Sequence, residues 1–385
     1  MTKILYVQFT AAANYPPLIA SSGILADGGC EVRILGVEAD GSAGSLRMAP
    51  HPRIAEANLA RGAARLSRAA GYPRFLARAR AEIARWRPDI VYCSDERSYP
   101  IGLWASTRTG CRTVLHEHDP PGEGRGGIVG AVLRQARRRF AQRATVCVIP
   151  QDERAKTFHA ETGASRVAVV YNCPRVGEVR VAVERTAREG FTLWYHGAIG
   201  PKQLPPQIVD ALALCPGDVR LAFAGYETLS SQGYAGRLME RAREHGISDR
   251  VQYHGPVPER AEMLRHAAGA DAGLALFSRV FRDPMVGASN KPFDYLACGL
   301  PLLINDTPEW GNFYGAEGVA VSCDPADPAD IARAVMALRD DPARCQGMAA
   351  RGEELIRTRW NYEAQFAKVI EALGIEMARK PASPH

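Results

Sequence analysis

The chain of 385 residues is long enough for two domains of ordinary size, and 46% hydrophobic and 23% charged residues are typical of a soluble globular protein. No run of about 18 or more uncharged apolar residues occurs, which argues against a transmembrane span. The N-terminus enters a strand-like run at once, without a signal-peptide pattern. Nine scattered cysteines form no CxxC pair, which favours reduced thiols in the cytoplasm over disulfides or a zinc site.

The charge is unevenly distributed. Residues 1–180 carry 26 Lys and Arg against 16 Asp and Glu, or +10, whereas residues 181–385 carry 22 against 26, or −4. A basic first half can attract an anionic membrane, a nucleic acid or an anionic substrate. A generally solvated basic surface is the simpler interpretation, and we expect no nucleic-acid partner. Peripheral contact with the inner membrane face through the segment 134–143 is compatible with this charge.

The first half alternates continuous apolar runs with helical patterns, as in a parallel sheet that is buried on both faces. The predicted strands are Ile4–Phe9, Val32–Val37, Ile90–Cys93, Thr113–His116, Ala144–Ile149 and Val167–Val170. Helices are predicted over Pro73–Trp86 and over the arginine-rich segment Ile128–Arg143, both with one apolar face.

A second series of the same kind follows residues 174–190, which contain Pro174 and Gly177 and resemble a linker. Its predicted strands are Phe191–His196, Leu221–Ala224, Val251–Tyr253, Ala272–Phe277, Pro301–Asn305 and Val319–Ser322. We therefore predict an α/β protein with two Rossmann-like doubly wound domains that face each other across a cleft. The predicted boundaries are 1–173, a linker 174–190, 191–358, and a C-terminal helix and tail at 359–385.

Ligands of such sheets bind beyond the carboxyl ends of the strands, so the residues there are the first candidates. The turn after the first strand contains Asn14 and Tyr15 but lacks the GxGxxG fingerprint of dinucleotide sites. The fourth strand leads into His116-Glu117-His118-Asp119. We expect the two histidines to point to opposite sides of the chain, which disfavours a metal site. They could instead line a sugar or phosphate pocket, donating a hydrogen bond or a proton, or be held by loop carbonyls in a structural role.

The strand ends of the second series are rich in glycine and basic residues. The first leads into Gly197-Ala-Ile-Gly-Pro-Lys202, where the backbone can approach a phosphate that Lys202 neutralises. The next ones lead into Gly225-Tyr226, His254-Gly255-Pro256-Val257, and Ser278-Arg279 followed by Arg282.

Residues 287–306 predict a capped helix followed by a buried strand. Ser289 or Asn290 can cap the helix, Pro292 suits its first turn and Gly299 can end it. A helix N-terminus beside Lys291 is a natural anion site, although an ordinary structural αβ unit has the same pattern.

Taken together, these motifs resemble the C-terminal domain of GT-B glycosyltransferases, especially glycosyltransferase family 4. The resemblance rests on the Gly197–Lys202 turn, the 223–225 and 249–257 strand ends, residues 270–276, and Ser289-Asn-Lys-Pro-Phe-Asp294-Tyr-Leu-Ala-Cys-Gly299-Leu-Pro301. The first half matches only in outline. Residues 360–363 look like the start of the helix that, in this fold, crosses back to the first domain.

The resemblance implies a role for each matching position. Asp294 takes the place of a glutamate that binds the ribose hydroxyls, and Ser289, Asn290 and Lys291 meet the diphosphate. Lys202 neutralises the leaving pyrophosphate, His254 to Val257 border the nucleobase, and His118 or His116 lies near the transferred sugar. The candidate catalytic residues are His118, Lys202 and Asp294; the candidate substrate-binding residues are Asn14, His116, Asp119, Gly197, Gly225, Tyr226, His254, Val257, Arg279, Ser289, Asn290 and Lys291.

The chain departs from the family pattern in three places. Ala198 replaces an arginine, for which Arg279 or Arg282 could substitute, and Val286 replaces the first glutamate of a paired motif. Residues 11–13 are alanines where the family has a glycine pair near the acceptor. The identity of the donor sugar is therefore not fixed by the resemblance.

The resemblance implies a hexosyltransferase that moves a sugar from a nucleotide diphosphate sugar to an acceptor hydroxyl, with retention and without metal or cofactor. A UDP-type donor is favoured over a GDP-type donor. The acceptor is a small molecule, a polysaccharide precursor or a lipid-linked sugar. Two alternatives remain open: a nucleotide-sugar epimerase that uses the cluster 116–119, and a non-catalytic nucleotide-binding module.

Overall fold

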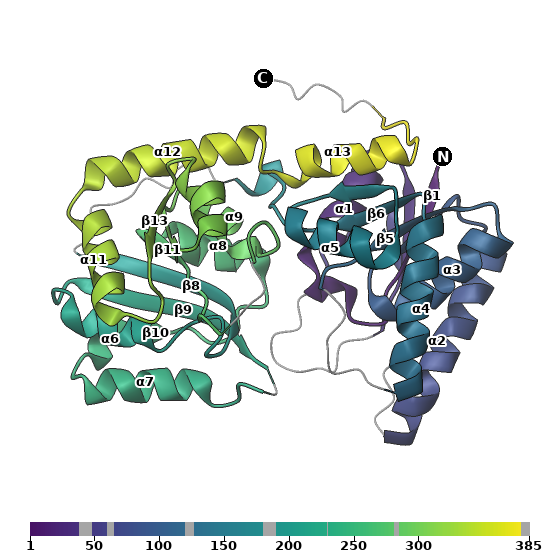
Figure 1. The fold of residues 1–385 in the computed structure, drawn as a ribbon. Helices are drawn as coiled ribbons and strands as arrows, with labels where there is room; N and C mark the ends of the chain where they lie inside the picture. The colour runs from purple at the N-terminus through teal and green to yellow at the C-terminus, as the bar shows by residue number, and fades with distance from the viewer. Residues whose placement is uncertain are drawn as a thin grey trace. The chain divides into compact units, whose positions relative to one another are not determined.

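The structure, a computed structural model, describes residues 1–37, 48–59, 65–119, 127–179, 190–228, 230–280 and 285–378. The chain folds into two compact units (Figure 1). Unit 1 consists of Met1–Asn172 and Tyr362–His385, and unit 2 consists of Cys173–Asn361. The C-terminal segment therefore belongs to the same unit as the N-terminal half.

Unit 1 is built on a parallel sheet of seven strands in the order β3-β2-β1-β4-β5-β6-β7. The strands are β1 (Lys3–Val7), β2 (Glu31–Leu35), β3 (Ile54–Glu56), β4 (Ile90–Cys93), β5 (Arg112–His116), β6 (Val146–Ile149) and β7 (Val167–Val169). Its α-helices are α1 (Pro16–Asp27), α2 (Arg65–Trp86), α3 (Tyr99–Arg108), α4 (Gly127–Arg143), α5 (Asp152–Thr162) and α13 (Tyr362–Ala372).

The central strands of this sheet are apolar on both faces because helices cover both sides (Figure 1). Alternate residues such as Tyr6 and Tyr92 pack with α1 and with Phe366 of α13. The intervening residues pack with α2, α3, α4 and α5, which bury Phe75, Phe140 and other apolar side chains on the opposite face.

Unit 2 has a parallel sheet of six strands in the order β10-β9-β8-β11-β12-β13. The strands are β8 (Phe191–Ile199), β9 (Val219–Glu227), β10 (Val251–Tyr253), β11 (Ala272–Ala275), β12 (Leu302–Asn305) and β13 (Ala320–Cys323). Its longer helices are α6 (Gln207–Leu214), α7 (Tyr234–Glu244), α8 (Arg260–Ala268), α9 (Asn290–Ala297), α11 (Pro328–Arg339) and α12 (Pro342–Thr358). Helices α6, α7 and α11 share the large core on one face, whereas α8 contacts β8 and α9 contacts β11 and β12.

The prediction of two parallel α/β sheets is confirmed, and all twelve predicted strands occur within a few residues of their expected ends. The short edge strand β3 was not predicted, because its residues are partly or fully exposed and lack an apolar run. Helix α1 was also missed. Most of its residues are buried, so its sequence has no polar stripe from which a period could be recognised.

Two glycines at the ends of β8 and β9 allow an unusually close approach of the backbones. Gly197 and Gly225 are paired in the sheet register, with φ angles of 115° and 144°. A Cβ atom added at Gly225 would lie 1.8 Å from the carbonyl oxygen of Gly197, a separation that no side chain can adopt. Glycine is therefore required here by sterics as well as by the backbone angle.

We predict that Gly225→Ala destabilises unit 2 by about 2 kcal/mol or more, since backbone strain and a steric clash act together. Thermal unfolding followed by circular dichroism would measure the loss. Gly217→Ala is the matched control, because no atom lies within 4 Å of the added methyl group. Equal melting temperatures for the two variants would contradict the prediction.

Candidate functional site

The carboxyl edge of the unit 2 sheet brings several of the predicted residues together. Gly197 lies beside Gly225, and the side chain of Lys291 crosses directly over Gly197. A Cβ atom at Gly197 would lie 3.0 Å from Cε of Lys291, so the glycine makes room for the lysine. The glycine turn and the start of α9, which are almost a hundred residues apart in sequence, thus form one surface.

Helix α9 begins at this surface without a side-chain cap. Ser289 occupies the N-cap position and is buried, but its side chain accepts no capping hydrogen bond. Asn290 is already the first helical residue. The prediction that one of these side chains caps the helix is therefore wrong. The backbone N–H groups of the first turn keep their positive partial charge for an external anion.

The ammonium group of Lys291 lies over two aromatic rings, 5.3 Å from the centroid of Tyr195 and 5.5 Å from that of Phe277. Among the described residues, no carboxylate lies within ion-pair distance of this ammonium group. Burial lowers the pKa of Lys291 to about 8, although the nearby Asp294 partly opposes the shift. This arrangement is a positive charge without a fixed counterion, which suits an anionic ligand.

Asp294 is buried beneath this surface, and N–H groups from two other elements hold its carboxylate. Arg260 donates to Oδ1 at 2.7 Å from Nη2 and to Oδ2 at 3.1 Å from Nη1, while Nε2 of His196 lies 3.3 Å from Oδ2. Burial raises the pKa of Asp294, but Arg260 and then His196 lower it to about 2 overall. The carboxylate is therefore ionised and fixed in orientation.

The tautomer of His196 follows from its second neighbour. The indole Nε1 of Trp194 can only donate, and it lies 3.0 Å from Nδ1 of His196. The ring proton must then reside on Nε2, which donates to Asp294. Burial is the main cause that lowers the pKa of His196, so the ring is neutral at neutral pH. Sequence reasoning assigned no role to His196 or Arg260; His196 ends a predicted strand, whereas nothing local marks Arg260.

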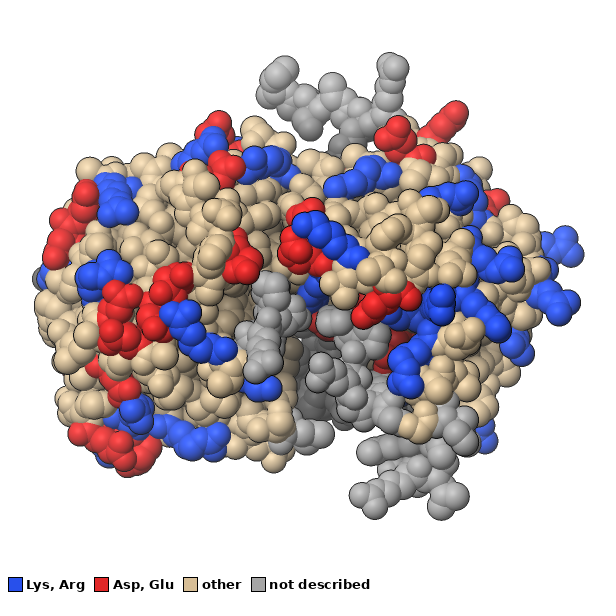
Figure 2. All heavy atoms as spheres, viewed as in Figure 1, with Lys and Arg blue, Asp and Glu red and all other residues tan. Residues whose placement is uncertain are grey.

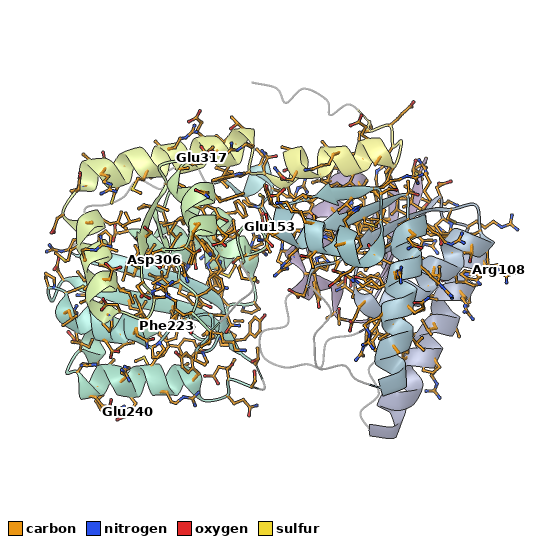
Figure 3. All side chains as sticks on the ribbon, in the orientation of Figure 1. Arg108, Glu153, Phe223, Glu240, Asp306 and Glu317 are labelled. Atoms are coloured by element: carbon orange, nitrogen blue, oxygen red, sulfur yellow. The ribbon has the colours of Figure 1, made fainter. Side chains whose placement is uncertain are left out.

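Two further basic residues of this edge differ in their surroundings. Lys202 is exposed in the turn after β8, and its carbonyl accepts a hydrogen bond from the backbone of Ser278 at 2.9 Å. Arg279 instead donates to Asp306, which directly follows β12 (Figure 3), and to Asp324. Arg279, one of the two arginines that could substitute at the diphosphate, is therefore already paired with two carboxylates. The other candidate, Arg282, lies outside the described residues.

The loop expected to border the nucleobase lies next to the same cluster. The ring of His254 is 5.7 Å from Trp194 and 4.6 Å from His266, and burial followed by the charge of His266 lowers its pKa. Gly255 accepts a hydrogen bond from the backbone of Gly225. Val257 is half-buried, and Tyr226 is 52% exposed at the end of β9.

In unit 1 the two histidines at the end of β5 point to the same side, which corrects the sequence-based expectation. Their ring centroids are only 4.0 Å apart, because residues two positions apart share one face of an extended chain. Nδ1 of His116 pairs with Tyr92 at 2.8 Å, and Nε2 of His118 pairs with Ser94 at 2.8 Å. The intervening Glu117 faces the opposite side, where Arg137 binds it.

This edge of unit 1 contains polar atoms without partners. Among the described residues, hydrogen-bond partners are lacking for Nε2 of His116 and Nδ1 of His118, and for the side-chain oxygens of Gln8 and Gln151. All four side chains are at least nine-tenths buried, and burial lowers the pKa of His118 to about 3. Such neutral, unsatisfied groups are suited to the hydroxyl groups of a ligand.

Two remaining candidates contribute less to this edge. The backbone of Asn14 ends the short 3₁₀ turn Ala12–Asn14, but its side chain lies outside the described part of the structure. Asp119 is 78% exposed as a side chain and lies 3.9 Å from Arg154. Within the described ranges, no three His, Cys, Asp or Glu side chains are grouped as a metal site requires.

Comparison with known families gives two matches that follow the two halves of the chain. Residues 23–173 match a glycosyl transferase 4-like domain, and residues 207–371 match a glycosyl transferase-like domain. Glycogen synthase of Mycobacterium tuberculosis is 23% identical over 293 residues, which are 72% of this chain. The match spans 66% of the length of that relative.

Solved structures share the architecture over almost the whole chain. Sucrose-phosphate synthase from Thermosynechococcus elongatus superposes with a TM-score of 0.73 at 15% identity, covering 96% of this chain and 98% of its own. The HepE protein of Anabaena, solved in complex with UDP and glucose, gives 0.71 at 16% identity, covering 97% and 100%. These matches, together with the two parallel α/β units, identify the chain as a member of the glycosyltransferases with the GT-B fold, with the resemblance to glycosyltransferase family 4 that its motifs indicated.

Proposed function

We propose that the protein transfers a hexose from a nucleotide diphosphate sugar to an acceptor hydroxyl, with retention of anomeric configuration and without a bound metal or other cofactor. The observation that carries the proposal is the surface where Lys291, the glycine pair 197/225 and the uncapped start of α9 meet above the ionised Asp294. A diphosphate suits the positive groups, and a ribose suits the carboxylate.

In this proposal, the charge of the departing diphosphate is stabilised by Lys291, by the N–H groups of α9 and by the exposed Lys202, whose four-carbon side chain has several rotatable bonds. Preorganised positive groups of this kind often supply the largest catalytic contribution. Lys202 has no hydrogen-bond or ion-pair partner for its ammonium group within the described residues, so it can move to the ligand. No carboxylate is proposed as a nucleophile.

A UDP-type donor is supported by the similarity to the HepE protein of Anabaena, which was solved in complex with UDP and glucose. The acceptor is proposed to be a small molecule, a polysaccharide precursor or a lipid-linked sugar. The unsatisfied polar atoms of His116 and His118 are suited to sugar hydroxyl groups at the edge of unit 1. His118 is the candidate for a direct role in transfer.

We predict that Lys202→Ala lowers kcat by about 100-fold, as expected for the loss of one preorganised charge on the leaving group. Asp294→Asn should lower donor turnover too, because the amide loses the negative charge and replaces one acceptor oxygen with an NH2 donor. A screen of nucleotide sugars for thermal stabilisation identifies the donor first, and release of nucleotide with and without acceptor then measures turnover. Lys156→Ala is the control, because this lysine is exposed and paired with Glu153.

Unchanged turnover in both variants would contradict the assignment. A new nucleotide sugar formed from donor alone would instead support the epimerase alternative.

The lowered pKa of Lys291 predicts a pH dependence of nucleotide diphosphate binding. The lysine is protonated below its pKa of about 8 and loses its charge as the pH rises through this value. Affinity for UDP should therefore fall by about tenfold between pH 7 and pH 9, measured by calorimetry. Lys291→Arg should abolish this fall, since a guanidinium stays charged. A parallel decline in the wild type and the variant would show that another group titrates.

We also propose that unit 1 contacts an anionic membrane surface through helices α2, α3 and α4, which share one face of its sheet with the more acidic α5. Helices α2, α3 and α4 carry many arginines, and Glu82 is their one acidic residue. Glu82 is already paired with Arg33 and Arg85. Figure 2 shows blue Lys and Arg side chains gathered over α3 and α4, and Arg108 lies at the end of α3 in Figure 3.

The helices on the opposite face of the same sheet carry far fewer basic residues. Helices α1 and α13 contain no arginine, one lysine and three acidic residues, namely Asp27, Glu363 and Glu371. On α4, Arg138, Arg139 and Arg143 are exposed, and no described carboxylate lies within ion-pair distance of them. No helix of the described chain is both long and apolar enough to cross a membrane. The proposed contact is therefore electrostatic and peripheral.

The triple variant Arg138→Gln, Arg139→Gln, Arg143→Gln should bind vesicles with one quarter phosphatidylglycerol about 100-fold more weakly, since each basic residue near an anionic bilayer contributes about 1 kcal/mol. Vesicle co-sedimentation at low and high salt would measure this loss. Removing three exposed arginines of unit 2, Arg220, Arg237 and Arg344, is the matched control. Equal binding of vesicles by the two triple variants would contradict the proposed membrane contact through helix α4.

A further inference from the structure

Arg260, the first residue of α8, lies between two carboxylates from different parts of unit 2. Its guanidinium binds both oxygens of Asp294, as described above, and both oxygens of Glu178. The Nη2 atom is shared, at 2.7 Å from Oδ1 of Asp294 and 3.2 Å from Oε2 of Glu178. A planar fork with five N–H groups is the side chain that can serve two carboxylates in this way.

The three side chains differ in burial, and this difference indicates what Arg260 does. Exposed fractions are 2% for Asp294, 24% for Arg260 and 29% for Glu178. A carboxylate as deeply buried as Asp294 needs a paired charge to stay ionised, and Arg260 is the principal cause that lowers its pKa. Two other groups near Asp294 are His196, which is neutral, and Lys291, which lies on the same helix α9.

Glu178 brings a third element into the cluster. It ends the 3₁₀ turn Val176–Glu178, and its Oε2 also accepts a hydrogen bond from the backbone N–H of Arg175 at 2.9 Å. This turn lies a few residues after Cys173, where the chain leaves unit 1 and enters unit 2. The same guanidinium therefore binds the entry segment 175–178 and the carboxylate beneath the proposed donor site.

We infer that Arg260 is a positioning residue for donor recognition: it keeps Asp294 ionised and oriented toward the ribose hydroxyls, and it couples this carboxylate to the entry segment 175–178 through Glu178. The inference rests on the proposed function, because it takes Asp294 as the ribose-binding group. Because binding couplings are reciprocal, a coupling through Arg260 means that a nucleotide engaging Asp294 also changes how firmly the entry segment is held.

The test compares binding of UDP with binding of its 2′-deoxy counterpart, which lacks one ribose hydroxyl. The wild type should prefer UDP by about tenfold, as expected for a hydrogen bond to a charged acceptor. Arg260→Gln should reduce this preference to about twofold, and Asp294→Asn should do the same. In the double variant the preference for UDP should fall no further, because both substitutions act on the same acceptor, the carboxylate of Asp294.

Arg265→Gln is the matched control, since Arg265 is an exposed arginine on the same helix. It should leave the preference for UDP intact. A loss of stability alone changes both affinities alike and leaves their ratio unchanged, so the ratio separates positioning from a structural role. Arg260→Lys should restore only part of the preference, because an ammonium group supplies charge without the fork.

Hydrogen exchange tests the coupling to the entry segment. UDP should change the exchange of peptides that cover residues 173–179 in the wild type, and this response should disappear in Glu178→Gln and in Arg260→Gln. A full preference for UDP in Arg260→Gln would overturn the positioning role, and an unchanged response in Glu178→Gln would overturn the coupling. If the wild type binds neither nucleotide, the proposed function fails, and this inference fails with it.

Discussion

Parallel strand pairing is the constraint on which the arrangement of both units depends. Every described strand pair in the two sheets is parallel, so all the strands of a sheet end at one edge. Residues far apart in sequence, such as Gly197 and Lys291, are brought into contact only because their strands and helices end there. The polar groups of unit 1, including His116 and His118, gather at the corresponding edge for the same reason.

Burial determines the chemistry that each edge offers. In unit 2, burial would neutralise Asp294, and Arg260 prevents this, so a permanent negative charge is maintained under a positive surface. In unit 1, the buried histidines have no such partner among the described residues, and burial lowers their pKa values, so they stay neutral. One edge therefore combines fixed charges of both signs, as a diphosphate and a ribose require, whereas the other presents neutral hydrogen-bonding groups of the kind that bind sugars.

The structure shows which groups surround the positions that depart from the family pattern. Arg279, which could substitute for the arginine missing at Ala198, is paired with Asp306 and Asp324. Arg260 provides another guanidinium in unit 2, and it binds the carboxylate of Asp294. The shorter side chain of Asp294 is compatible with this arrangement, because the carboxylate lies close to the backbone of α9 and is held by donors from α8 and β8.

The sequence alone predicted the fold class, every described strand except the edge strand β3, and most of the candidate donor-site residues, because apolar runs and glycine-rich strand ends are local signals. It could not reveal that Arg260 and His196 hold Asp294, since these residues are 34 and 98 positions away from Asp294 in the sequence. It also misplaced the two histidines relative to each other and assigned Ser289 or Asn290 a capping bond that neither side chain makes. Only the tertiary structure decides which charges are paired, because ion pairs depend on distances across the fold rather than on spacing along the chain.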